Sequence, residues 1–176
     1  MEEDLQALVG RIHAMPPRVV YAFAGAGSLA LWWLHRVAGS SRTLLEAIDC
    51  YAPRSLEALL GAPPTQSVSA EVARAMAVRA YTRASLLSDR DGPLLGVGCT
   101  AALATDRERR GADRCFLAIR EANVVYGYTL SMNRERGREE QEDLVSRLVI
   151  GAIAVMCGVR DDVRLALRSD EDLFCW

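Results

Sequence analysis

Lysine is absent from this sequence, and all 21 of its basic residues are arginine. A guanidinium group stays protonated at neutral pH, so it cannot act as a general base. Every mechanism that needs a catalytic lysine from this chain is therefore excluded.

Long apolar runs are also missing. No stretch approaches the roughly 20 residues that a membrane-spanning helix needs, and the acidic opening, MEEDLQ, does not have the pattern of a secretory leader. The net charge is only −2, which gives no overall field for nucleic acid or a membrane surface. We expect a cytoplasmic protein that binds neither.

Paired cysteines are absent as well. The five cysteines are scattered and contain no CxxC pair, which favours reduced thiols over a disulfide framework or a zinc site. No metal and no cofactor are expected. The five cysteines are Cys50, Cys99, Cys115, Cys157 and Cys175. We expect the first four to be small buried residues.

What is present is the composition of a globular protein, with 51% hydrophobic and 25% charged residues among 176. We expect a single domain over residues 1–176, with an amphipathic helix at 2–14, a core at 18–158 and a tail at 159–176. Apolar runs predict strands at 18–24, 43–50, 93–100, 114–120 and 124–132. Periodic segments predict helices at 27–38, 53–60, 69–87 and 139–157. This order predicts an α/β fold, a three-layer α/β/α sandwich with a mixed sheet of about five strands.

Two aromatic features suggest contacts beyond the core. Trp32 and Trp33 cannot both face the core from one helix, and the polar tail ends in Phe174, Cys175 and Trp176. The tail is expected to dock on the body or to form a subunit contact, and a homo-oligomer is expected.

Four acidic residues cluster at the start of the last helix. They are Glu139, Glu140, Glu142 and Asp143. Acids at a helix N-terminus favour the positive end of the dipole, so we expect solvated charge there rather than a metal site.

A glycine-rich turn lies between the first strand and the next helix. Residues 25–30, GAGSLA, fit the pattern G-x-G-x-x-A, and Asp49 follows 24 residues after Gly25. A dinucleotide-binding fold places a ribose-binding acid at about that spacing. A tight strand–helix turn that needs small residues explains the same pattern, and the predicted hairpin after the third strand is unlike a dinucleotide fold.

Four stretches read together resemble the C-terminal domain of CinA, a family that includes nicotinamide-nucleotide amidases. They are FAGAGSLALWWLHRVAGSSRTLLEAIDCY (23–51), VSAEVARAMA (68–77), LLGVGCTAAL (94–103) and the loop into RCFLAI (114–119). The most specific elements are V-A-G-S-S at 37–41, ten residues before Tyr51, and V-S-x-E at 68–71. The resemblance covers about residues 18–157 and implies the sandwich fold.

The resemblance assigns the family's catalytic positions to residues that lack the chemistry. The nucleophilic serine falls on Ala24, the glutamate before it on Phe23, and the lysine of the second turn on Leu56. Two glycines of the turn fall on Gly27 and Ser28, and the family tyrosine is kept as Tyr51. The family's G-I-A-G-P strand end becomes residues 98–102, and its K-P-V-G loop becomes residues 109–112. The chain therefore resembles a divergent branch that lacks the usual serine and lysine.

These observations predict a module that binds a nucleotide or another phosphate ligand and has lost the amidase reaction. An active amidohydrolase that uses Ser28 and Tyr51 remains an alternative, and so does a structural or oligomerisation domain without a ligand. Backbone amides at a helix N-terminus would hold the phosphate, and arginine forks of the 105–111 loop would grip it. The expected ligand-binding residues are Ala24, Gly25, Ala26, Gly27, Ser28, Tyr51, Thr100, Arg107, Arg109 and Arg110.

Overall fold

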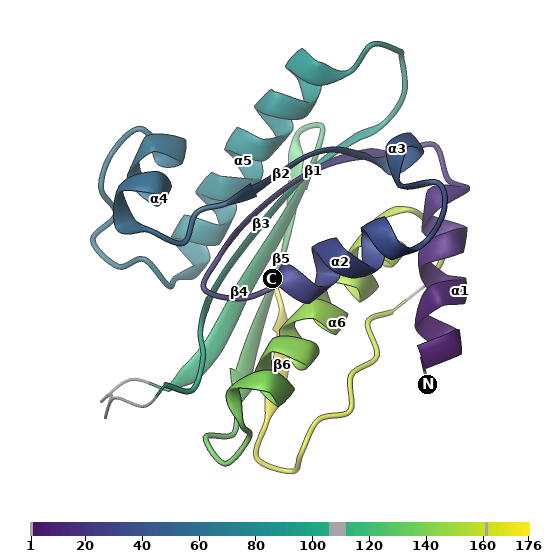
Figure 1. Cartoon of the computed structure of the whole chain (residues 1–176). Coiled ribbons are helices and arrows are strands. Elements are labelled where there is room, and N and C mark those ends of the chain that lie inside the picture. The colour runs from purple at the N-terminus through teal and green to yellow at the C-terminus, as the bar shows by residue number, and fades with distance from the viewer. Residues whose placement is uncertain (1, 106–111, 161) are drawn as a thin grey trace.

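The computed structural model describes residues 2–105, 112–160 and 162–176, which build one mixed six-stranded sheet between two helical layers (Figure 1). The strands lie in the order β2-β1-β3-β4-β5-β6. They are β1 (Arg18–Ala24), β2 (Leu44–Asp49), β3 (Leu94–Ala102), β4 (Asp113–Glu121), β5 (Val124–Met132) and β6 (Asp172–Cys175). The helices are α1 (Glu2–His13), α2 (Ser28–Arg36), α3 (Ser40–Thr43), α4 (Pro53–Leu60), α5 (Ala70–Leu87) and α6 (Arg138–Met156).

The first three strands are parallel and the last three are antiparallel. β1 pairs with β2 on one side and β3 on the other, both parallel, while β3, β4, β5 and β6 follow one another antiparallel. Because β1 is central, its residues are buried after Arg18. The predicted α/β/α sandwich and its β4–β5 hairpin are confirmed.

The sheet has one strand more than the five that the sequence predicts. The extra strand is β6, which comes from the tail and pairs with β5 at the edge of the sheet. Four residues, DLFC, are too few for an apolar period to show in the sequence. The tail therefore docks on the body through backbone hydrogen bonds, one of the two outcomes expected for it.

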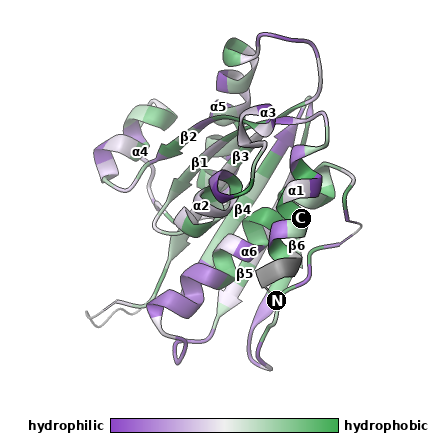
Figure 2. Ribbon diagram, turned by 45° about the vertical axis from the view of Figure 1, so that its right-hand side comes forward, coloured by the Kyte–Doolittle hydropathy of each residue, from purple (hydrophilic) through white to green (hydrophobic). Residues whose placement is uncertain are grey.

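The two faces of the sheet carry different cores. α1, α2 and α6 cover one face with a large cluster that includes Ile12, Leu34 and Leu148. α4 and α5 cover the other with a smaller cluster around Met76 and Leu56. α6 is hydrophilic in its first turns and hydrophobic afterwards (Figure 2), which allows its second half to be buried almost completely.

The first four cysteines are buried and Cys175 is exposed, as the sequence predicts for the four. Trp33 is 8% exposed and Trp32 is 51% exposed, so only one of the pair faces the core. Among the described residues, no helix has the length and apolar character that crossing a membrane requires.

Candidate functional site

The turn between β1 and α2 depends on its two glycines. Gly25 has φ +86° and Gly27 has φ +102°, both in the left-handed region that L side chains rarely adopt. A Cβ at Gly25 would overlap the carbonyl oxygen of Ala101, and one at Gly27 would overlap the hydroxyl of Tyr21. The turn is therefore fixed by close packing as well as by backbone conformation.

A fully buried tyrosine supports the turn from below. The Tyr21 hydroxyl donates to the carbonyl of Gly27 at 3.0 Å, and its side chain is 0% exposed. Burial raises the pKa of Tyr21 well above its ordinary value. This hydroxyl therefore stays protonated and acts as a structural donor, not as a base.

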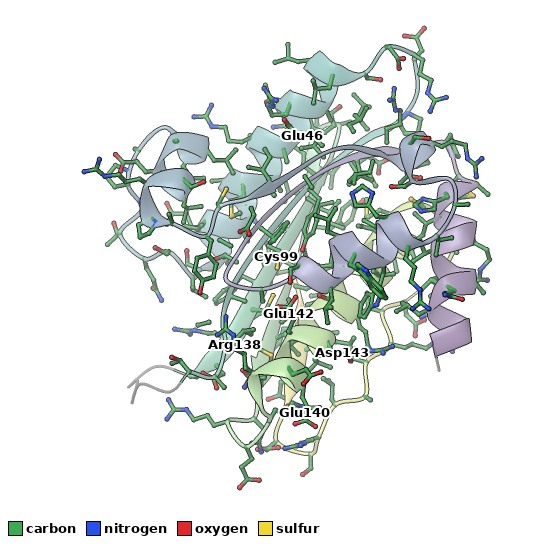
Figure 3. All side chains as sticks on the ribbon, in the orientation of Figure 1. Glu46, Cys99, Arg138, Glu140, Glu142 and Asp143 are labelled. Carbon is green, nitrogen blue, oxygen red and sulfur yellow. The ribbon has the colours of Figure 1, made fainter. Side chains whose placement is uncertain are left out.

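A carboxylate already occupies the turn's hydrogen-bond donors. Both oxygens of Glu142 lie 3.0 Å from the amide nitrogen of Gly27, and Oε1 also accepts from the Leu29 amide at 3.1 Å. The Ser28 hydroxyl donates to the same oxygen at 3.0 Å. Glu142 projects from α6 toward the start of α2 (Figure 3). The anionic group at this helix N-terminus is thus a side chain of the protein itself, at the place where the sequence predicts a phosphate ligand.

For Glu142 this contact corrects the expectation of solvated charge at the start of α6, whereas Glu139 and Glu140 are exposed as expected. Glu142 caps α2 and also accepts from the Ser146 hydroxyl at 3.2 Å. Asp143 pairs with Arg147 at 2.6 Å, and Glu140 pairs with Arg168 at 3.5 Å. The sequence could not show this, because 115 residues separate Glu142 from Gly27. In the part of the chain that the structure describes, no group of acids, histidines and cysteines is arranged to hold a metal ion.

A cavity of about 480 Å³ opens beside the turn. Its volume lies in the range of small-molecule sites. The lining residues are Phe23, Gly25, Ala26, Ser28, Asp49, Tyr51, Arg138, Glu139 and Glu142. Tyr51 is 71% exposed. Asp49 ends β2 in register with Phe23 of β1, which brings it to the mouth of the turn.

The structure brings together only part of the predicted site. Gly25, Ala26, Ser28 and Tyr51 line the cavity, and Gly27 holds Glu142 instead. Ala24 is 8% exposed and does not line the cavity.

Three further groups of residues complete the comparison with the predicted set. The Thr100 hydroxyl is committed to the carbonyl of Ser67 at 2.8 Å and lies outside the lining. Arg107, Arg109 and Arg110 lie outside the described residues. Sequence reasoning missed Arg138 and Glu139 as lining residues, since a solvated helix start gives no signal for a cavity.

Comparisons with known proteins place this geometry in a known fold. No family model and no curated protein matches the chain. A competence/damage-inducible protein, CihA, of Agrobacterium tumefaciens matches with a TM-score of 0.64 and 20% identity over 89% of this chain and 95% of that one. CinA-superfamily proteins of Klebsiella pneumoniae and Escherichia coli match with TM-scores of 0.68 and 0.64, at 14% and 16% identity. They cover 90% and 86% of this chain and 98% and 88% of theirs.

The chain has the fold of the CinA superfamily.

Two positions of the CinA fold are apolar here. Ala24, where the resemblance puts the nucleophilic serine, ends β1 with a side chain that has no reactive group. Leu56, where it puts the lysine, is 3% exposed and packs in the cluster beneath α5. A covalent route needs a nucleophile and a group that takes its proton, and these two residues supply neither.

Proposed function

We propose that this CinA-fold protein is a small-molecule-binding module whose cavity beside the glycine turn takes a nucleoside or nucleotide, without the amide hydrolysis of the resembled family. One observation carries the proposal. A cavity of 480 Å³ joins the turn to Asp49 and Tyr51, while the positions expected for serine and lysine hold Ala24 and Leu56.

The charge of the cavity indicates which part of the ligand binds best. Among the described residues, its lining holds three acids, Asp49, Glu139 and Glu142, and one cation, Arg138. Carboxylates accept hydrogen bonds from ribose hydroxyls and attract a positively charged ring, but they repel a phosphate. The exposed ring of Tyr51 is available for stacking on a base. A nucleoside with a cationic ring therefore suits the lining, whereas a phosphate has to displace Glu142 from the turn.

Three probes separate these contributions in a calorimetric titration. Nicotinamide riboside carries the ring and the sugar, nicotinamide mononucleotide adds a phosphate, and inorganic phosphate tests the anion alone. We expect the riboside to bind at least as tightly as the mononucleotide, and inorganic phosphate not to bind. Tyr51→Ala should weaken the riboside about tenfold, because base stacking on an aromatic ring is worth ~1–3 kcal/mol. Tyr126→Ala, on β5 and 44% exposed, is the matched control.

Removing the internal carboxylate should reverse the preference. In Glu142→Ala the amides of Gly27 and Leu29 are free, so the mononucleotide should bind at least tenfold more tightly than the riboside. Binding of neither compound to the native chain or to Glu142→Ala would contradict the proposal and favour a structural role. A mononucleotide that binds the native chain much more tightly than the riboside would contradict the ligand class.

A second function is favoured by one contact. The Ser28 hydroxyl donates to Glu142 at 3.0 Å inside the cavity, which is the arrangement of a nucleophile and a base. Against it, Glu142 holds the amides of Gly27 and Leu29 that would otherwise stabilise an oxyanion. Ammonia release from nicotinamide mononucleotide tests this alternative. We expect none; release that Ser28→Ala abolishes and Ser40→Ala leaves intact would establish an amidohydrolase instead.

Self-association remains part of the proposal. The exposed rings of Trp32 and Phe174, at 51% and 60%, would be partly covered in a homo-oligomer. Sedimentation velocity over a hundredfold range of concentration measures the assembly state. A single monomeric species throughout that range would remove oligomerisation from the account.

A further inference from the structure

A second cavity, of about 530 Å³, lies away from the glycine turn, between α1, α6 and the segment 162–171. We call this segment the strap; it runs beside α6 and α1 before β6 begins (Figure 1). The lining residues are Leu5, Leu8, Arg136, Asp143, Leu144, Arg147, Gly151, Arg160, Arg164, Leu165 and Ala166. None of them belongs to the site proposed above.

Positive charge dominates this lining. Among the lining residues that the structure describes, four are arginines and one, Asp143, is a carboxylate, in a chain whose net charge is −2. Arg136 is held by Glu171, and Arg147 by Asp143 at 2.6 Å. Two of the four guanidinium groups are thus paired firmly within the protein.

Within the described part of the chain, the other two guanidinium groups are held less firmly. Arg164 pairs with Asp162 at 3.0 Å, but both side chains are largely exposed, and such pairs contribute little. Arg160 is half-buried, and among residues 5–105, 112–160 and 162–176 its guanidinium has neither a hydrogen-bond acceptor nor a carboxylate partner. Its amide bonds to the carbonyl of Ala154, which fixes its backbone just beyond α6. A half-buried guanidinium without an acceptor is a group that an anion would satisfy.

The rest of the wall is apolar. Leu5 and Leu8 contribute from α1, Leu144 from α6 and Leu165 from the strap. The strap is also anchored apolarly, since Val163 packs over Gly151 with its Cγ1 3.2 Å from where a Cβ would lie. An apolar ligand body can pack between these side chains while an anionic head stays at the arginines. The cavity therefore combines two kinds of contact that match an amphiphile.

We propose that this cavity binds a small anionic amphiphile, with a carboxylate or phosphate head at Arg160 and Arg164 and a short aliphatic chain along the leucines of α1, α6 and the strap. The head is recognised through charge-assisted hydrogen bonds, which arginine forks form with either anion. The aliphatic part gains from leaving water at roughly 0.8 kcal/mol for each buried CH₂. Neither contact alone selects the ligand; the combination does.

Calorimetric titration of the full chain with three eight-carbon probes tests the proposal. Octanoate and octyl phosphate carry the two head groups, and 1-octanol has the same chain without charge. We expect saturable binding of at least one anion, at least tenfold tighter than 1-octanol. The ratio between the two anions identifies the preferred head. Equal binding of octanol and both anions, or no saturable binding of either anion, would overturn the proposal.

Variants locate the site. Arg160→Gln should weaken the bound anion about tenfold, and Leu165→Asn should weaken it severalfold, while Arg54→Gln, on the exposed surface of α4, should leave it unchanged. The unfolding temperature of each variant shows whether it is folded, and Arg164→Gln replaces Arg160→Gln if that variant is not. Undiminished anion binding in the folded arginine variant would place the binding elsewhere and overturn the assignment.

Discussion

At the scale of single residues, Gly27 determines whether the turn can form. Its positive φ is costly for any other residue, and the overlap with the Tyr21 hydroxyl adds to that cost. Gly158 also has a positive φ, of +69°, but a Cβ there would contact nothing. Comparing substitutions at Gly27 and Gly158 therefore separates the cost of backbone strain from the cost of steric overlap.

We predict that Gly158→Ala lowers the free energy of unfolding by about 1 kcal/mol, the cost of the left-handed backbone alone. Gly27→Ala should lower it by about 3 kcal/mol or more, because it adds overpacking and disturbs Tyr21. Urea denaturation of both variants measures this. Equal losses in the two variants would show that the overlap has no energetic consequence.

His13 makes a second prediction at this scale. The ring is 1% exposed; its Nε2–H donates to the carbonyl of Leu34 at 2.9 Å, and Nδ1 lies 2.9 Å from the Thr43 hydroxyl, which donates to it when the ring is neutral. Burial lowers the pKa of His13 below its ordinary value of 6.5, and the neighbouring Arg42 lowers it further. The folded state therefore disfavours the proton that the unfolded chain accepts.

The direction in which the free energy of unfolding changes with pH follows from proton linkage. Below pH 6.5 the unfolded state binds more protons at this position, so the free energy of unfolding should fall as the pH drops from 7.5 to 5.5, with a slope of at most ~1.4 kcal/mol per pH unit. Above pH 7.5 this contribution is constant. His13→Gln should remove the slope, whereas His35→Gln should keep it. An unchanged slope in His13→Gln, measured by urea denaturation across this range, would refute the assignment.

The sequence could predict the glycine turn but not what fills it. The glycines at 25 and 27 can be predicted from the sequence, because positive φ and close packing require glycine there. The contact of Glu142 with the turn cannot be predicted, because Glu142 reaches the turn from a helix more than a hundred residues later. A carboxylate among other charges at the start of a helix gives no local signal for such a contact. For the same reason, the sequence does not predict that Arg138 and Glu139 line the cavity. Local sequence rules predict backbone geometry. Contacts between residues that meet only through tertiary packing can be predicted only once the fold is known.

At the scale of elements, a buried ion pair is among the contacts that hold the strap to the body. Glu171 is 5% exposed; it binds Arg136 and accepts the amides of Asn133 at 3.0 Å and Arg168 at 2.7 Å. These contacts, chiefly the Arg136 guanidinium, lower the pKa of Glu171 to about 2. The Glu171 carboxylate thus links the end of β5, the loop that leads into α6 and the strap.

Glu171→Gln should therefore lower the free energy of unfolding by about 3 kcal/mol near neutral pH, the equivalent of the lowered pKa. The native contribution is complete above pH 4.5 and is lost as the pH falls toward 2, so the difference between the variant and the native chain should narrow over that range. Glu57→Gln, on the surface of α4, is the control. Guanidinium chloride denaturation at pH 7 and pH 3 gives both values. A difference that stays constant across this pH range would show that the pair contributes nothing through ionisation.

At the scale of the whole molecule, apolar runs separated by periodic helical segments predict the parallel half of the sheet and the hairpin. They fail at β6, which is short and is placed by pairing with β5, and at α3, a single turn between α2 and β2. The resemblance to CinA supplies the same architecture independently, and solved structures with that fold confirm it at 20% identity or less. The fold is thus better predicted than the site, because burial patterns repeat along an element while a binding residue occurs once.

The whole account depends on a cavity that binds a nucleoside and does not cut its amide. One NMR titration tests both halves: nicotinamide riboside is added to ¹⁵N-labelled protein, and the ligand's own spectrum is followed in the same tube. We predict saturable shifts of the Gly25, Ala26 and Tyr51 amides, and a nicotinamide amide that stays intact for a day. Unshifted turn amides, or conversion of the amide to the acid, would contradict the account.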